Sequence, residues 1–176
     1  MKTKYCIMVL ILMLVFLLRH NPEPSSKPVN LGEVVRLHVL ANSDSEYDQS
    51  IKLKVRDGVI TYLNPHLRNA KNIAEAEAII RAHKKQIKEV ADFILHSLNA
   101  PYSSEVVNGQ FSFPIKVYGD LVFPSGNYKA VKILLGKGDG SNWWCVLFPP
   151  LCFVDMENGA ALQRPEADKE EKKTKV

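Results

Sequence analysis

The first patterned segment of the chain is Val34 to Ala41, in which side chains on one side are apolar and two on the other are charged or polar. One side carries Val35, Leu37 and Val39, and the other carries Arg36, His38 and Leu40. A period of two predicts a half-buried β-strand. The segment ends at Asn42 to Ser45, a cluster of short polar side chains that favours turns and helix starts.

Two helices are predicted after this strand. In the first, Ile51, Val55, Val59 and Leu63 recur every four residues, Asp44 or Ser45 can cap the first turn, and Pro65 is expected to end it. The second is predicted from Asn72, with Glu75 as its capping partner, to Leu98, where Asn99 and Pro101 close it. Its apolar positions are Ile73, Ala76, Ile80, Ile87, Val90, Ile94 and Leu98.

The rest of the chain changes to short β-type runs. The predicted strands are Val106–Val107, Gln110 to Val117, Asn127 to Leu135 and Trp143 to Phe148, with Asn108–Gly109 as a tight hairpin turn. An order of strand, two helices and several strands predicts the α+β class. We therefore expect a two-layer sandwich, with two helices on one face of a mainly antiparallel sheet.

The N-terminus has the pattern of an export signal. Lys2 and Lys4 precede the uncharged apolar run Tyr5 to Leu18. As a helix this run would rise about 21 Å, which suits a signal peptide better than a comfortable span of the roughly 30 Å hydrocarbon core. No small-x-small pair follows Leu18, so an uncleaved signal anchor remains open for residues 1–20.

Length and composition predict one folded domain between two appendages. A chain of 176 residues has room for one compact domain, expected at residues 31–156. Residues 21–30 hold three prolines and two serines and read as a solvated linker, while residues 157–176 read as a charged, disordered tail. A net charge of +4 without basic blocks between aromatics argues against nucleic-acid binding.

Few residues offer chemistry. Residues Gly136 to Ser141 lack the spacing of a phosphate-binding Walker loop and read as a turn between strands. Cys145 and Cys152 can form a disulfide or remain buried thiols, and the pattern does not decide between these. No second Cys or His pair at ligand spacing supports a metal site. A secreted thiol-dependent hydrolase using Cys145 with His38 is the alternative reading, and it rests on residue identity alone.

Four stretches together resemble the stage II sporulation protein R family of endospore-forming bacteria. They are RLHVLANSDSEYDQSIKLKVRD at Arg36 to Asp57, FPIKVYG at Phe113 to Gly119, FPSGNYKAV at Phe123 to Val131, and GKGDGSNWWCVLFPPLCFVD at Gly136 to Asp155. The resemblance spans most of the predicted domain. It implies a protein made in the forespore and exported into the space between the forespore and mother-cell membranes. There it would trigger a membrane-embedded aspartic-type protease in the mother cell, and that protease would cleave the precursor of the early mother-cell sigma factor.

A protein ligand of this kind needs a contact surface and no catalytic set, cofactor or small-molecule substrate. We expect its membrane contact through the N-terminal segment, and its protease contact through aromatics and prolines beside turns. Because neighbouring strand residues face opposite ways, at most one of the two tryptophans should be buried in the sheet layer. The candidate contact residues are Trp143, Trp144, Phe148, Pro149, Pro150, Arg36, His38 and Asp44.

Overall fold

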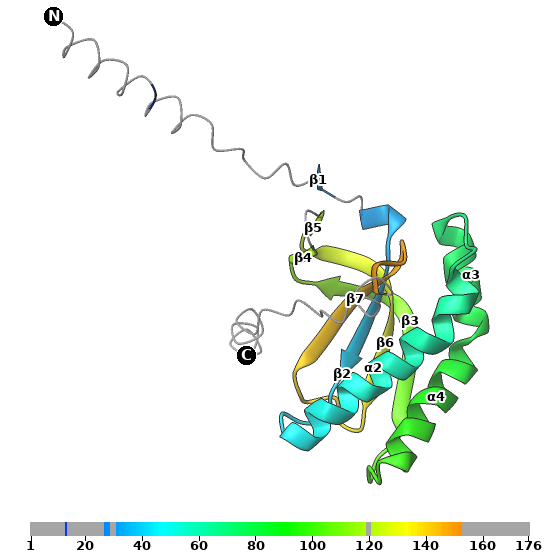
Figure 1. The fold of residues 1–176 in the computed structure, drawn as a ribbon, viewed down its shortest axis with the longest axis vertical. Helices are drawn as coiled ribbons and strands as arrows, with labels where there is room; N and C mark the ends of the chain where they lie inside the picture. The colour runs from blue at the N-terminus through cyan, green and yellow to red at the C-terminus, as the bar shows by residue number, and fades with distance from the viewer. Residues whose placement is uncertain (1–12, 14–26, 29–30, 119–120, 153–176) are drawn as a thin grey trace, which may run out of the picture.

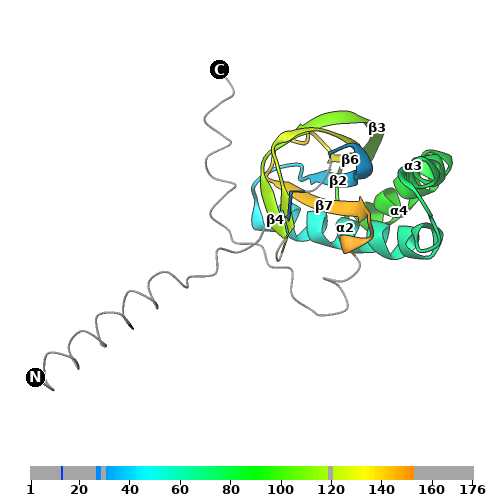
Figure 2. The same ribbon diagram turned by 90° about the horizontal axis from the view of Figure 1, so that it is seen from above.

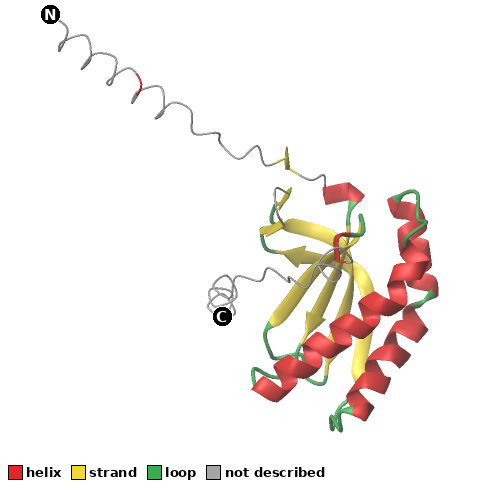
Figure 3. Ribbon diagram, in the orientation of Figure 1, coloured by secondary structure: helices red, strands yellow, loops and turns green. Residues whose placement is uncertain are grey.

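The computed structural model describes residue 13 and residues 27–28, 31–118 and 121–152 (Figure 1). Its elements are β1 (Lys27–Pro28), the 3-10 helix η1 (Leu31–Glu33), β2 (Val35–Leu40), α2 (Glu46–Leu67), α3 (Ile73–Ala82), α4 (Lys84–Ser97), β3 (Ser104–Phe113), β4 (Lys116–Tyr118), β5 (Leu121–Phe123), β6 (Gly126–Leu135) and β7 (Asn142–Phe148). The α-helices from α2 to α4 lie between residues 46 and 97, and five of the seven described strands follow them. Figure 3 shows these helices together on one side of the strands. The expected α+β class is confirmed.

The larger sheet has the strand order β3-β6-β2-β7, and β2 is inside it. β2 pairs antiparallel with β7, and β3 pairs antiparallel with β6. The central pair of β2 and β6 is parallel, with Leu37 opposite Val131. The sheet is therefore mixed but mainly antiparallel, as expected.

Three helices, and not the expected two, cover one face of this sheet (Figure 2). The predicted second helix is divided at His83, which ends α3 and begins α4 with φ −92° and ψ 8°. No Gly or Pro marks the break, and the apolar spacing continues through it from Ile80 to Ile87. A hydrogen bond between the side chains of Tyr62 and His83 instead holds the junction against α2.

The predicted helix starts are confirmed, and one predicted helix end is wrong. Ser45 caps α2 by accepting from the Asp48 amide, and Asn72 caps α3 by accepting from the Glu75 amide. Pro65 does not stop α2, which continues to Leu67. Because Leu67 is 1% exposed, its burial favours completing the last turn in spite of the proline.

Two other expectations need correction. Asn108 and Gly109 form no hairpin, because they lie inside β3 and pair with Val131 and Ala130 of β6. The continuous ladder along all of β3 outweighs the local turn preference of these residues. Within the predicted linker, Lys27 and Pro28 pair in parallel with Leu121 and Val122 of β5, so part of it is a strand.

The remaining terminal predictions lie outside the described residues. These are the signal or anchor segment at 1–20, most of the linker and the charged tail at 157–176. Within the described part of the chain, no helix is both long and apolar enough to cross a membrane.

The larger sheet is covered on both faces, so the two-layer description is incomplete. One apolar cluster lies between the sheet and the helices and includes Leu37, Val39 and Ile133. A second lies on the other face, where Phe113, Tyr128 and other side chains of the larger sheet meet residues of β4 and β5. β4 and β5 belong to a smaller sheet of order β1-β5-β4, which acts as a third layer.

The expected turn at Gly136 to Ser141 is confirmed, and it is fastened to the start of α2. The amide of Gly140 donates to the Ala41 carbonyl, and the amide of Ser141 donates to the Asp44 carboxylate. The backbones approach so closely that a Cβ on Gly140 would lie 2.2 Å from the Ser43 carbonyl oxygen.

Gly140→Ala should therefore lower the free energy of unfolding by about 1–3 kcal/mol, because a backbone carbonyl cannot move aside easily. Gly109→Ala is the control, since the added Cβ meets only the Phe111 ring, at 3.3 Å. This control should stay within about 0.5 kcal/mol of the parent protein. Urea denaturation measures the free energy of unfolding of both variants. Equal losses in the two variants would contradict the close approach of Gly140 to the Ser43 carbonyl.

Candidate partner-binding site

The two tryptophans of β7 face opposite sides of the larger sheet, and both are buried. Trp143 is 7% exposed and packs in the helix-side cluster, where the Arg56 guanidinium lies 4.8 Å from its ring centroid. Trp144 is 8% exposed and packs in the opposite cluster. The expectation that one of them is exposed is wrong, because the smaller sheet and its aromatic side chains cover the face that was taken to be open.

Arg36 lies in the core of the second cluster. Its side chain is 0% exposed, and its Cζ lies 4.4 Å from the ring centroid of Phe113 and 5.0 Å from that of Tyr128. Phe123 and Tyr118 complete the aromatic surroundings at 5.5 and 6.0 Å. Burial lowers the pKa of Arg36, while the phenols of Tyr118 and Tyr128 act in the opposite direction. The charge is thus held by ring faces and hydroxyl groups.

The hydrogen bonds of Arg36 join three strands. Nη2 donates to the Tyr118 hydroxyl of β4 at 3.1 Å, and Nε reaches the Cys145 carbonyl of β7 at 3.5 Å. The Tyr118 hydroxyl also donates to the Trp144 carbonyl at 3.1 Å. Nη1 is buried without a hydrogen-bond partner among the described residues. The guanidinium therefore links the smaller sheet to the larger one.

His38 is buried beside Trp144. It is 5% exposed, and the two ring centroids are 3.6 Å apart in a stacked arrangement. Its Nε2–H donates to Oδ1 of Asn142 at 2.7 Å, which leaves Nδ1 unprotonated and without a partner among the described residues. Burial lowers the pKa of His38 to about 3, because a second proton would be placed in an apolar site.

The structure separates Asp44 from the other candidates. Asp44 is exposed at the start of α2, where its carboxylate accepts from the Ser141 amide and hydroxyl. Arg36 and His38 lie inside the molecule, and the prolines lie beyond the far end of β7. The eight candidates therefore do not form one surface, and their role in partner binding stays a prediction.

The first turn of α2 carries a buried carboxylate, that of Asp48, which the sequence pattern did not single out. Asp48 is 5% exposed and accepts hydrogen bonds from the side chains of Asn42, Ser43 and Tyr102. Burial alone would raise the pKa of Asp48, but these donors hold it below its ordinary value. In the sequence, Asp48 is marked only by its position three residues after the cap residue Ser45. Any ordinary acidic residue in the first turn of a helix has such a position, so it does not indicate a special role.

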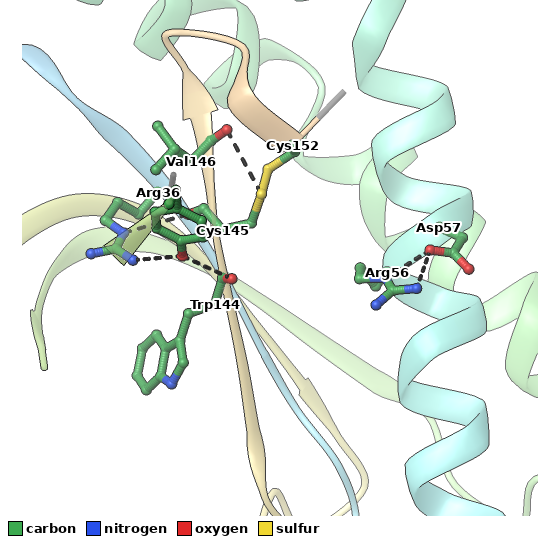
Figure 4. Close-up of a disulfide and its surroundings, with 8 residues drawn as sticks. Arg36, Arg56, Asp57, Trp144, Cys145, Val146 and Cys152 are labelled. Carbon is green, nitrogen blue, oxygen red and sulfur yellow. Dashed lines mark hydrogen bonds and ion pairs between the residues drawn. A yellow bond between two sulfur atoms is a disulfide. The ribbon is translucent and has the colours of Figure 1, made fainter. Parts of the chain in front are cut away.

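Cys145 and Cys152 are joined by a disulfide, with their Cα atoms 5.8 Å apart (Figure 4). This decides between the two readings that the sequence left open. The bond encloses residues 146–151, and we call residues 148–151 the proline turn. Pro149 and Pro150 are exposed, Phe148 is half-buried, and the Leu151 amide donates to the Pro149 carbonyl at 2.8 Å. Apart from Asp44, the proline turn is the part of the predicted contact surface that is exposed.

Figure 4 also shows that Trp144 and the disulfide leave β7 in different directions. Cys145 belongs to the helix-side cluster and His38 stacks on Trp144 in the other, so the sheet lies between the sulfur and the imidazole. Among the described residues, no group of three or more His, Cys, Asp or Glu side chains is placed to hold a metal ion.

A profile of the family described as stage II sporulation protein R matches residues 31–158. The chain belongs to the stage II sporulation protein R family. It is also 43% identical, over 152 residues, to the stage II sporulation protein R of Bacillus subtilis (strain 168). That alignment covers 86% of this chain and 67% of the relative. No solved structure matches the chain significantly.

The link through Arg36 can be measured with a double-mutant cycle. Tyr118→Phe should lower the free energy of unfolding by about 1–3 kcal/mol, because Nη2 of the buried cation loses its acceptor. In an Arg36→Met protein the same change should cost at least about 1 kcal/mol less, because no buried cation then needs that acceptor. Chemical denaturation of the four proteins gives the coupling. Equal losses in both backgrounds would show that Tyr118 acts independently of Arg36.

The buried imidazole predicts a loss of stability in mild acid. The unfolded chain takes up a proton at His38 below the ordinary pKa of 6.5, whereas the folded chain does so only near pH 3. Stability contributed by the neutral ring is thus present above pH 6.5 and is lost as the pH falls. Between pH 7 and pH 5 the loss from this residue should be about 2 kcal/mol.

His38→Gln keeps a donor for Asn142 and removes the titration. Unfolding curves of the parent and the variant at pH 7 and pH 5 isolate the effect of His38 from all other titrating groups. A variant with the same pH dependence as the parent would contradict this assignment.

Proposed function

We propose that this protein is an exported sporulation signal that activates a membrane-embedded aspartic-type protease. The protease would then process the precursor of the early mother-cell sigma factor. Family membership across residues 31–158 is the observation that carries the proposal. The 43% identical relative from Bacillus subtilis, a stage II sporulation protein R, supports a role in sporulation.

The disulfide supports a location outside the cytoplasm. Disulfides persist in oxidising compartments and are rare where thiols are kept reduced. The bond between Cys145 and Cys152 therefore fits a domain that has crossed the forespore membrane into the intermembrane space. The positively flanked apolar run Tyr5 to Leu18 is the matching export or anchor signal.

The same bond bears on the alternative, a thiol-dependent hydrolase. A nucleophilic cysteine needs a free thiolate and a base within hydrogen-bond reach. The Cys145 sulfur is bonded to Cys152, and His38 lies on the other face of the sheet. These two observations favour a ligand that acts by binding over an enzyme built on Cys145.

We propose the proline turn as the protease contact. Pro149 and Pro150 are exposed, and Phe148 offers part of an aromatic ring beside them. A turn closed by a disulfide and containing two prolines has little conformational freedom to lose, which favours binding. Because Trp143 and Trp144 are buried, substituting them would test the fold more than the contact.

The first test is co-expression of the chain, the candidate protease and the sigma-factor precursor in a host that does not sporulate. Precursor cleavage should require the chain. Pro150→Glu should reduce cleavage at least about tenfold if the turn is a binding hot spot. Pro101→Glu is the matched control, because Pro101 is also an exposed proline but precedes β3, at the other end of the larger sheet.

Three outcomes are informative. No cleavage with a correctly exported, disulfide-bonded chain would refute protease activation. Equal cleavage with Pro150→Glu and Pro101→Glu would move the contact away from the proline turn. A Cys145→Ala, Cys152→Ala chain that still folds, is exported and supports cleavage would eliminate the hydrolase alternative.

A further inference from the structure

The smaller sheet carries an apolar patch on the face that points away from the larger sheet. Ile115 and Val117 are each 61% exposed, and Val122, directly opposite Val117 in the β4–β5 pair, is half-exposed. We call these three residues the outer patch. Tyr118, next to Val117 in the strand, faces inward and contacts Arg36. Strand alternation thus explains why the outer patch is apolar and yet uncovered.

The outer patch lies beside the point where the N-terminal part of the chain joins the fold. β1 pairs with β5 through Lys27 opposite Leu121 and Pro28 opposite Val122, and β5 pairs with β4 (Figure 1). Since neighbouring strands are about 4.8 Å apart, β1 lies only about 10 Å from β4. The sequence places the apolar run Tyr5 to Leu18 shortly before β1. Even fully extended, the chain from Leu18 to Lys27 spans at most about 30 Å.

We propose that the outer patch contacts the surface of the lipid bilayer that holds the N-terminal segment. The inference rests on one part of the proposed function, namely that this segment stays attached to the domain and inserts in a membrane. Contiguous exposed apolar side chains mark contact surfaces, and aliphatic groups can bury themselves at the boundary of headgroups and acyl chains. A short tether keeps the outer patch at high effective concentration near the bilayer, so a weak contact is enough.

This contact sets the orientation of the domain. Two attachments, one through the chain and one through the outer patch, leave the domain less rotational freedom than a tether alone. The proline turn follows the end of β7, where Phe148 pairs with Val35 at the start of β2. It therefore lies at the end of the larger sheet that the tether enters, and an oriented domain would hold it in a fixed position relative to that bilayer.

The test uses the full chain with Cys6→Ser, so that an introduced cysteine is the one free thiol beside the disulfide. Val117→Cys carries an environment-sensitive fluorophore, and Phe93→Cys is the matched control. Phe93 is 73% exposed on α4, so it is equally apolar and accessible, but it lies in the helical layer. Each labelled chain is reconstituted in vesicles of phosphatidylethanolamine and phosphatidylglycerol, with and without nitroxide groups on the acyl chains.

The label at Val117 should be quenched by the acyl-chain nitroxides several-fold more strongly than the label at Phe93. Adding Ile115→Asp should reduce the quenching at Val117 while flotation of the chain with the vesicles stays unchanged. Equal resistance to trypsin verifies that all variants are folded.

Equal quenching at the two positions, or a chain that does not float with vesicles, would overturn the proposal. Shielding of the Val117 label that needs the protease, in vesicles where lipid alone has no effect, would also overturn it and identify a protein as the occupant. The precursor-cleavage assay separates the two proposals. Cleavage without lipid quenching counts against the lipid contact alone, and quenching without cleavage counts against protease activation alone.

Discussion

The buried guanidinium of Arg36 is the constraint on which the arrangement of layers depends. A buried cation near the start of β2 requires aromatic faces and acceptors, and the smaller sheet supplies Tyr118 and Phe123 for that purpose. The larger sheet supplies Phe113 and Tyr128. Without the cation, β4 and β5 would keep their apolar contacts with the larger sheet and the hydrogen bond from Tyr118 to the Trp144 carbonyl. With it, their position is fixed by a group that is costly to leave unpaired.

The same residue shows why the sequence predicted one half of the core and missed the other. Val35, Leu37 and Val39 mark a buried face by their alternation, and they do face the helices. Arg36 and His38 read as the solvent side of a strand, because charged and titratable side chains are seldom buried. Their burial depends on aromatic residues far along the chain, and no local pattern contains that information. The hidden second face is also why both tryptophans are covered.

The sequence predicted correctly those features that depend on interactions between residues close together in the chain. The caps at Ser45 and Asn72 were predictable because a side chain and an amide a few residues away make the bond. The ends and breaks of elements depended on tertiary contacts, as with burial of Leu67 beyond Pro65 and the contact of Tyr62 with His83. For the candidate site, the sequence analysis identified the exposed prolines and both cysteines. It could not show that Asp44 and Arg36 lie in separate parts of the fold. That separation follows from strand length and packing.

The position of β2 in the larger sheet has a consequence for the order of assembly. Both strand neighbours of β2 come from the C-terminal part of the chain, since β6 and β7 follow all three helices. A chain that appears N-terminus first therefore holds β2 without a strand partner until residues 126–148 have followed. Each helix needs backbone hydrogen bonds only within itself, whereas the sheet that the helices cover needs strands from both parts of the chain. A chain that crosses a membrane in an extended state can therefore complete this domain only on the far side, after nearly the whole chain has passed.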